Sequence, residues 1–123
     1  MFRFVPLILP MLIAATAAQA NFFNGRDLDA LCRNDAPDCR AYIAGVVDSM
    51  ETKAYWEGRR GADMLRRKLG PFEHCWPGRA APVEAAVEVV RRYLADHPTE
   101  HRHPAAEIIA KALSEIYACP QGA

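Results

Sequence analysis

The sequence predicts an all-α fold, a small disulfide-stapled helical bundle of about four to five helices. Apolar residues recur at the helical period in several segments, and no segment shows the strict alternation that is typical of a half-buried strand. The chain of 123 residues contains four cysteines, an even number that is typical of disulfides in small exported domains. These observations favour one small domain with two disulfides.

Residues 1–20 have the layout of a cleavable secretory signal. One arginine precedes a long uncharged run, and Ala18 and Ala20 are the small residues of a cleavage site before Asn21. A membrane anchor is the alternative, but the apolar run is short for a bilayer and two prolines interrupt it. We therefore expect export and cleavage, which leave a single mature domain over residues 21–123.

Two helices are expected in the first half of the mature chain. Asn24 is a good N-cap for a short first helix, and Asp35 caps a second helix that has a proline in its first turn. The second helix is expected to run to about Glu57, with Val46 in the centre of its buried stripe. Gly45 is expected to permit the close approach of a neighbouring helix. The apolar stripe consists of Cys39, Tyr42, Ile43, Val46, Val47, Met50 and Ala54.

An irregular middle separates these helices from two more. The middle covers residues 58–82, is rich in glycine, proline and arginine, and is expected to form a short helix over residues 63–69. Pro82 opens the third helix, which ends before Pro98 because proline disfavours the α conformation in the residue preceding it. Pro104 opens the last helix after a short polar loop.

The cysteines are Cys32, Cys39, Cys75 and Cys119. The first helix ends where the second begins, which brings Cys32 near Cys39. A short loop between the third and fourth helices predicts antiparallel packing, which brings Cys75 near Cys119. We favour these two pairs among the three possible connectivities. Zinc is the alternative, but the spacing lacks a CxxC clamp, and an oxidising compartment disfavours a reactive thiol at Cys75 beside His74.

Three histidines, His97, His101 and His103, cluster with Glu100 and Glu107 and suggest a metal site. The flanking prolines place them in a loop, so an exposed polar turn is the better interpretation. The chain contains no known catalytic motif and no pair of carboxylates suited to acid–base chemistry. We therefore expect a protein that is not an enzyme and that needs no metal or cofactor.

Charge and aromatic residues indicate what the protein contacts. The chain has 15 basic and 15 acidic residues, whereas nucleic-acid-binding proteins carry a strong basic excess. Aromatic and arginine side chains flank the irregular middle, where they either fill the end of the bundle or anchor a protein partner. The stretch Gly58–Phe72 adds five basic residues that suit an acidic partner surface. The expected partner-binding residues are Trp56, Arg59, Arg60 and Trp76.

Several segments of the mature chain share a pattern with a known family. They are Phe23-Asn24-Gly25-Arg26-Asp27-Leu28, Leu31-Cys32, the helix from Asp38 to Asp48, Phe72-x-x-Cys75-x-Pro77, Tyr93-Leu94-x-x-His97-Pro98, Ala112-Leu113 and Cys119-Pro120. In this order, and together with the four cysteines, they resemble the Rap/Tai family of immunity proteins over essentially the whole mature chain.

The resemblance implies a periplasmic, disulfide-bonded helical protein, with a homodimer as one option. It also implies that the protein binds a peptidoglycan amidase effector delivered by type VI secretion and blocks its active site, with no chemistry of its own. The alternative is a periplasmic client-binding or stress protein, similar to the acid chaperones, without a cognate toxin. A metal-binding module based on the histidine loop is a third and weaker hypothesis.

Overall fold

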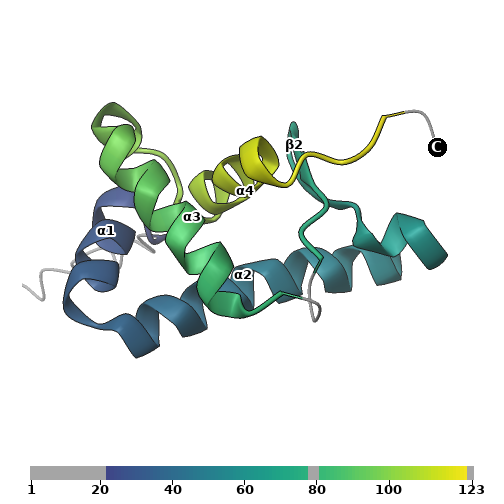
Figure 1. The fold of residues 1–123 in the computed structure, drawn as a ribbon, viewed down its shortest axis with the longest axis horizontal. Coiled ribbons are helices and arrows are strands. Elements are labelled where there is room, and N and C mark those ends of the chain that lie inside the picture. Colours follow the sequence, from purple (N-terminus) through teal and green to yellow (C-terminus); the bar gives the residue numbers. More distant parts are fainter. Residues whose placement is uncertain (1–21, 78–80, 122–123) are drawn as a thin grey trace, which may run out of the picture.

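A computed structural model of the chain describes residues 22–77 and 81–121, so the expected signal over residues 1–20 lies outside the described residues. Within these ranges the chain forms four α-helices, two short 3₁₀ helices and one antiparallel hairpin (Figure 1). In chain order the elements are α1 (Gly25–Asn34), α2 (Ala36–Trp56), η1 (Gly61–Leu65), β1 (Arg67–Leu69), β2 (Phe72–His74), α3 (Val83–Asp96), η3 (Pro98–Glu100) and α4 (Ala105–Ile116). The fold is mostly helical, as expected, but the hairpin means that it is not purely all-α.

The first two helices begin where the sequence predicts. The Asn24 side chain accepts a hydrogen bond from the Asp27 backbone N–H at 3.0 Å, and the Asp27 carboxylate accepts one from the Asn24 N–H at 3.1 Å. This reciprocal capping box satisfies two backbone donors that the first turn leaves free. Asp35 caps α2 by accepting from the Asp38 N–H at 3.0 Å, and a proline occupies the first turn.

Helix α2 is the element on which most of the fold packs: α1, α3, α4, η1 and β1 all contact it (Figure 1). Its fully buried residues are Cys39, Ile43, Val47, Met50 and Ala54. Val46 is only half-buried, so the expectation that it lies at the centre of the stripe is wrong, and that centre is at Val47. No atom lies within 4 Å of the position that a Cβ on Gly45 would take, so the expected close helix approach at this glycine is also wrong.

The expected helix over residues 63–69 is replaced by η1 and the first strand of the hairpin. Strand β1 pairs antiparallel with β2, and Arg67 lies opposite His74 while Leu69 lies opposite Phe72. Gly70 joins the strands with φ of +56°, a left-handed conformation that glycine adopts at little cost. Pairing with β2 takes residues 67–69 out of the expected helix, and Gly70 with the proline that follows it lets the chain reverse between the two strands.

Both expected disulfides form. Cys32 and Cys39 link the end of α1 to the first turns of α2, and Cys75 and Cys119 link the segment after β2 to the segment after α4. Among the described residues no cysteine is left free, so all four are used in covalent pairs rather than in a zinc site. Within the same part of the chain, no helix has both the length and the apolar character needed to cross a bilayer.

Candidate partner-binding surface

The four residues expected to bind a partner lie in two different environments. Trp56, at the end of α2, is 79% exposed, and Arg60 is exposed on the turn that follows. Arg59 is half-buried. Trp76 is 5% exposed and belongs to the core, so its ring fills the end of the bundle and is not a surface anchor. We name residues 55–72, which contain the first three, the basic arm.

The exposed end of α2 presents two aromatic rings. Tyr55 and Trp56 are 61% and 79% exposed, and their rings meet edge to face with centroids 5.6 Å apart. Leu65 of η1 is also largely exposed. Large apolar side chains that remain in water do not contribute the stabilisation that burial would give the free protein. Tryptophan and tyrosine are among the residues most enriched in the energetically dominant contacts of interfaces. The arm is therefore equipped to bury apolar surface against another molecule.

Arginine side chains form hydrogen bonds within the arm and between the arm and the rest of the protein. Arg59 donates from Nη1 to the carbonyl oxygen of Arg66 at 2.6 Å, and its Nη2 lies 2.9 Å from the Glu57 carboxylate. Arg66 donates from Nη1 to Glu73 at 2.6 Å and from Nη2 to the carbonyl oxygen of Pro120, also at 2.6 Å. The arm is thus fixed to β2 and to the C-terminal segment beyond the second disulfide.

Arg67 anchors the base of the arm from inside the protein. It is 2% exposed, donates from Nη1 to the Trp76 carbonyl oxygen at 2.5 Å, and pairs through Nη2 with Glu51 of α2 at 3.2 Å. Its guanidinium carbon lies 5.9 Å from the centre of the Trp76 ring, within the range of a cation–π interaction. A buried guanidinium needs such partners because the loss of water is costly for a charge.

His74 is fully buried opposite Arg67 in the hairpin. Burial, and then the positive charge of Arg67, lower the pKa of His74 from its ordinary value of 6.5 to about 4. The imidazole is therefore neutral at neutral pH. Sequence reasoning considered His74 only as a neighbour of Cys75. It missed the burial of Arg67, because nothing in the run Arg66-Arg67-Lys68 distinguishes the buried arginine from its exposed neighbour Lys68.

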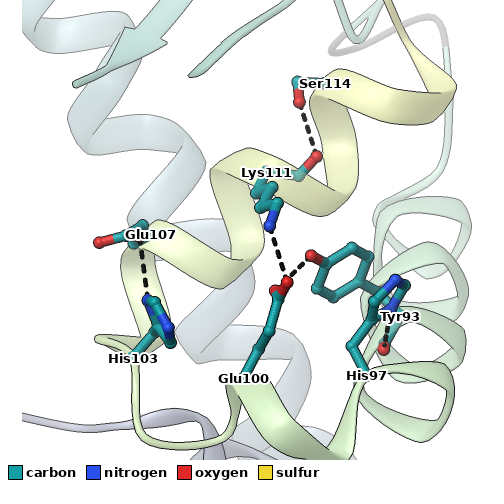
Figure 2. Close-up of polar contacts among 7 residues, drawn as sticks. All are labelled: Tyr93, His97, Glu100, His103, Glu107, Lys111 and Ser114. Carbon is teal, nitrogen blue, oxygen red and sulfur yellow. Dashed lines mark hydrogen bonds and ion pairs between the residues drawn. The ribbon is translucent and has the colours of Figure 1, made fainter. Parts of the chain in front are cut away.

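The histidine loop is a packed turn rather than a metal centre. His97 stacks on Tyr93 with ring centroids 3.9 Å apart and donates from Nδ1 to the Tyr93 carbonyl oxygen at 2.9 Å (Figure 2). His101 donates from Nε2 to the Leu94 carbonyl oxygen at 2.7 Å, while His103 lies 3.3 Å from Glu107. Within residues 22–77 and 81–121, no group of three or more His, Cys, Asp or Glu side chains is arranged to hold a metal ion.

A charged cluster closes the same turn. The Glu100 carboxylate accepts hydrogen bonds from the Tyr93 hydroxyl and, at 2.8 Å, from Lys111 Nζ (Figure 2). The bond from Lys111, followed by that from Tyr93, lowers the pKa of Glu100, and the bond to Glu100 raises the pKa of Lys111. Lys111 also lies about 6 Å from the ring centres of Phe72 and Tyr93. The cluster joins α3, the turn and α4, and through Phe72 it also reaches β2, so its contacts are those of a structural cluster.

A second candidate surface is a hollow of about 650 Å³ between the start of α2 and α3. Pro37 and Val87 contribute to its floor, while Arg40 and Glu84 meet across it in an ion pair of 2.7 Å. Of the other charged residues that line the hollow, Glu88 pairs with Arg92 outside the lining, and Arg91 forms no ion pair among the described residues. The hollow has no aromatic ring in its lining, whereas the arm exposes two. The basic arm is the better candidate site.

Comparison with known proteins identifies one family. A family model described as Rap1a immunity proteins matches residues 24–119. No curated protein and no solved structure matches the chain. The matched range begins at the N-cap of α1 and ends at the last cysteine of the long disulfide, so it includes the whole of the basic arm.

Proposed function

This chain belongs to the Rap1a family of immunity proteins, and we propose that it protects its cell by binding and occluding a peptidoglycan amidase that type VI secretion delivers to the periplasm. The family match over residues 24–119 is the single observation that carries the proposal, since immunity proteins act by binding a toxin. Export through the expected signal at residues 1–20 places the protein in the compartment where such an amidase attacks the cell wall.

The basic arm is the contact surface in this proposal. Trp56 and Arg60 are exposed on it, and Arg59 fixes the turn between them, so these three of the four expected residues remain candidates. Trp76 contributes by supplying the carbonyl oxygen that holds Arg67, and its ring is not a contact. An exposed aromatic pair at the end of α2 suits insertion into the groove of an enzyme, which blocks access of the substrate.

The internal bonds of the arm favour tight binding. A surface that is already ordered before association avoids part of the entropic cost of fixing side chains and loops in the complex. The arm meets this requirement through Arg59, Arg66 and Arg67, each of which donates to a backbone carbonyl group within the protein. The long disulfide, Cys75–Cys119, joins the two segments to which Arg66 and Arg67 bind.

A periplasmic rescue experiment tests the proposal. A candidate peptidoglycan amidase effector, sought among the genes adjacent to that of this protein, is expressed with a signal sequence in a host that lacks the immunity protein, and we expect lysis. Co-expression of the full-length chain is expected to prevent lysis, whereas a form without residues 1–20 is expected to fail because it stays in the cytoplasm. Lysis that continues in the presence of the exported, oxidised protein would contradict the immunity role.

The test also separates the alternative function. A protein that gives no protection and binds no amidase, yet prevents the aggregation of acid-unfolded periplasmic proteins, would be a client-binding protein. The family resemblance further implies that members often dimerise, and sedimentation velocity on the oxidised protein measures whether this chain does.

A further inference from the structure

The charges of this protein are segregated although their sum is zero. The basic arm holds five basic and two acidic residues out of the 15 of each kind in the chain, so the remainder of the chain is acidic in excess. Such an uneven distribution creates a local positive potential that steers association with a surface of the opposite sign. The arm therefore differs from the rest of the protein in the partner that it attracts.

The structure shows which cations of the arm are available. Arg59, Arg66 and Arg67 are engaged by internal hydrogen bonds and ion pairs. Arg60 and Lys68 are exposed, and among the described residues neither of them forms an ion pair. Lys68 lies opposite Glu73 in the hairpin, but Arg66 already binds that carboxylate at 2.6 Å.

The exposed rings of Tyr55 and Trp56 lie at the beginning of the same arm, before the turn that carries Arg60. We propose that the partner's docking site is an acidic protein surface around an apolar recess, with Trp56 in the recess and with Arg60 and Lys68 facing carboxylates at its rim. This inference rests on the proposed function, and it adds the chemistry of the surface that the arm recognises.

A protein partner fits the arm better than a membrane or a nucleic acid does. An unpaired Lys or Arg near an anionic lipid surface contributes only about 1 kcal/mol, so Arg60 and Lys68 together give weak adsorption. Nucleic-acid binding requires many phosphate contacts, and most guanidinium groups of the arm already have protein partners. Two exposed cations and a large exposed ring on one segment match the rim and centre of a protein interface.

Association kinetics test the inference with the oxidised mature protein and the amidase from the rescue experiment. The double variant Arg60→Glu/Lys68→Glu is expected to slow association about 10-fold at low salt, and the difference is expected to shrink at 0.5 M NaCl because salt screens exposed charges. Trp56→Ala is expected to raise Kd about 30-fold or more, mainly through faster dissociation. Circular dichroism checks that each variant folds.

A matched control makes the same change of charge elsewhere. Arg26→Glu/Arg102→Glu alters two exposed arginines of α1 and of the turn after η3, and it is expected to leave association nearly unchanged. Equal slowing by both double variants would show that only net charge matters and would overturn the inference. The wild type is also tested against vesicles of phosphatidylglycerol and phosphatidylethanolamine, and arm-dependent binding to them without arm-dependent binding to the amidase would overturn it as well.

The outcomes separate the two proposals. If the wild type fails to bind the amidase, the immunity role and the inference both fall. If the wild type binds tightly and the arm variants bind equally well, the immunity role stands and only the acidic docking site is wrong.

Discussion

The α1 corner, the name we give to residues 22–39 together with the turn of residues 101–105, and the basic arm each lie next to a disulfide, but different interactions hold them. At the corner, backbone groups pair directly: the Gly25 N–H donates to His103 at 2.9 Å and the Ala105 N–H donates to Phe23 at 2.8 Å. In the arm, arginine side chains donate to backbone carbonyl groups, and Trp56 stays in water. Backbone pairing closes the corner, whereas side-chain bonds hold the arm in shape and leave its rings free for a partner.

The two disulfides provide the largest expected contrast between these regions. The cysteines at the corner are 7 residues apart in sequence, and those that secure the arm are 44 apart. Chain-entropy arguments then predict that Cys75→Ala/Cys119→Ala lowers the free energy of unfolding by about 4 kcal/mol and Cys32→Ala/Cys39→Ala by about 2.5 kcal/mol. Urea unfolding of both variants measures the two losses. A larger loss at the corner would contradict the view that the long disulfide secures the arm.

Acid is expected to lower the free energy of unfolding of the domain through His74, which pairs with Arg67 of the arm in the hairpin. Because the pKa of His74 is about 4 in the folded protein and about 6.5 when unfolded, the unfolded chain takes up a proton first as the pH falls. This site therefore removes about 3 kcal/mol of stability between pH 6.5 and pH 4, and little more below that range.

The variant His74→Gln isolates this effect, since it removes the titrating group and leaves every carboxylate in place. Between pH 6.5 and pH 4 the wild type is expected to lose more unfolding free energy than the variant does. Parallel curves for the two proteins would mean that His74 does not carry the acid sensitivity.

Substitutions at two glycines test how tightly the α1 corner is packed. A Cβ on Gly25 would lie 2.9 Å from the His101 Cα and closer still to Ile108, whereas nothing lies within 4 Å of one on Gly45. We expect Gly25→Ala to cost about 1–3 kcal/mol through overpacking and Gly45→Ala to stabilise by up to about 1 kcal/mol through helix propensity. Thermal unfolding gives both values, and a neutral Gly25→Ala would show that the corner is loosely packed.

Sequence reasoning succeeded where a local rule decides the structure. The caps at Asn24 and Asp35, the helices that follow Pro82 and Pro104, and both disulfide pairings were predictable from capping chemistry, proline geometry and loop length. The predicted centre of the buried face of α2 was wrong by one residue. An apolar stripe that includes both Val46 and Val47 does not show which of the two faces the other helices.

The arm was harder to predict because tertiary contacts determine it. Strands of three residues are too short to show an alternating pattern, and Gly70 with the proline after it was the one local signal for the hairpin. Trp76 could be assigned to the core or to the surface from sequence, and only the tertiary packing, in which its ring joins the hydrophobic core, decides between them. Burial of one arginine in a run of three basic residues has no local signature.

Hydrogen–deuterium exchange of the oxidised protein, with and without the amidase, shows directly whether the basic arm is the contact surface. We predict that binding slows amide exchange in residues 55–72 and leaves exchange in the α1 corner and around the α2–α3 hollow unchanged. Slower exchange at the hollow, with the arm exchanging as fast as in the free protein, would contradict this prediction.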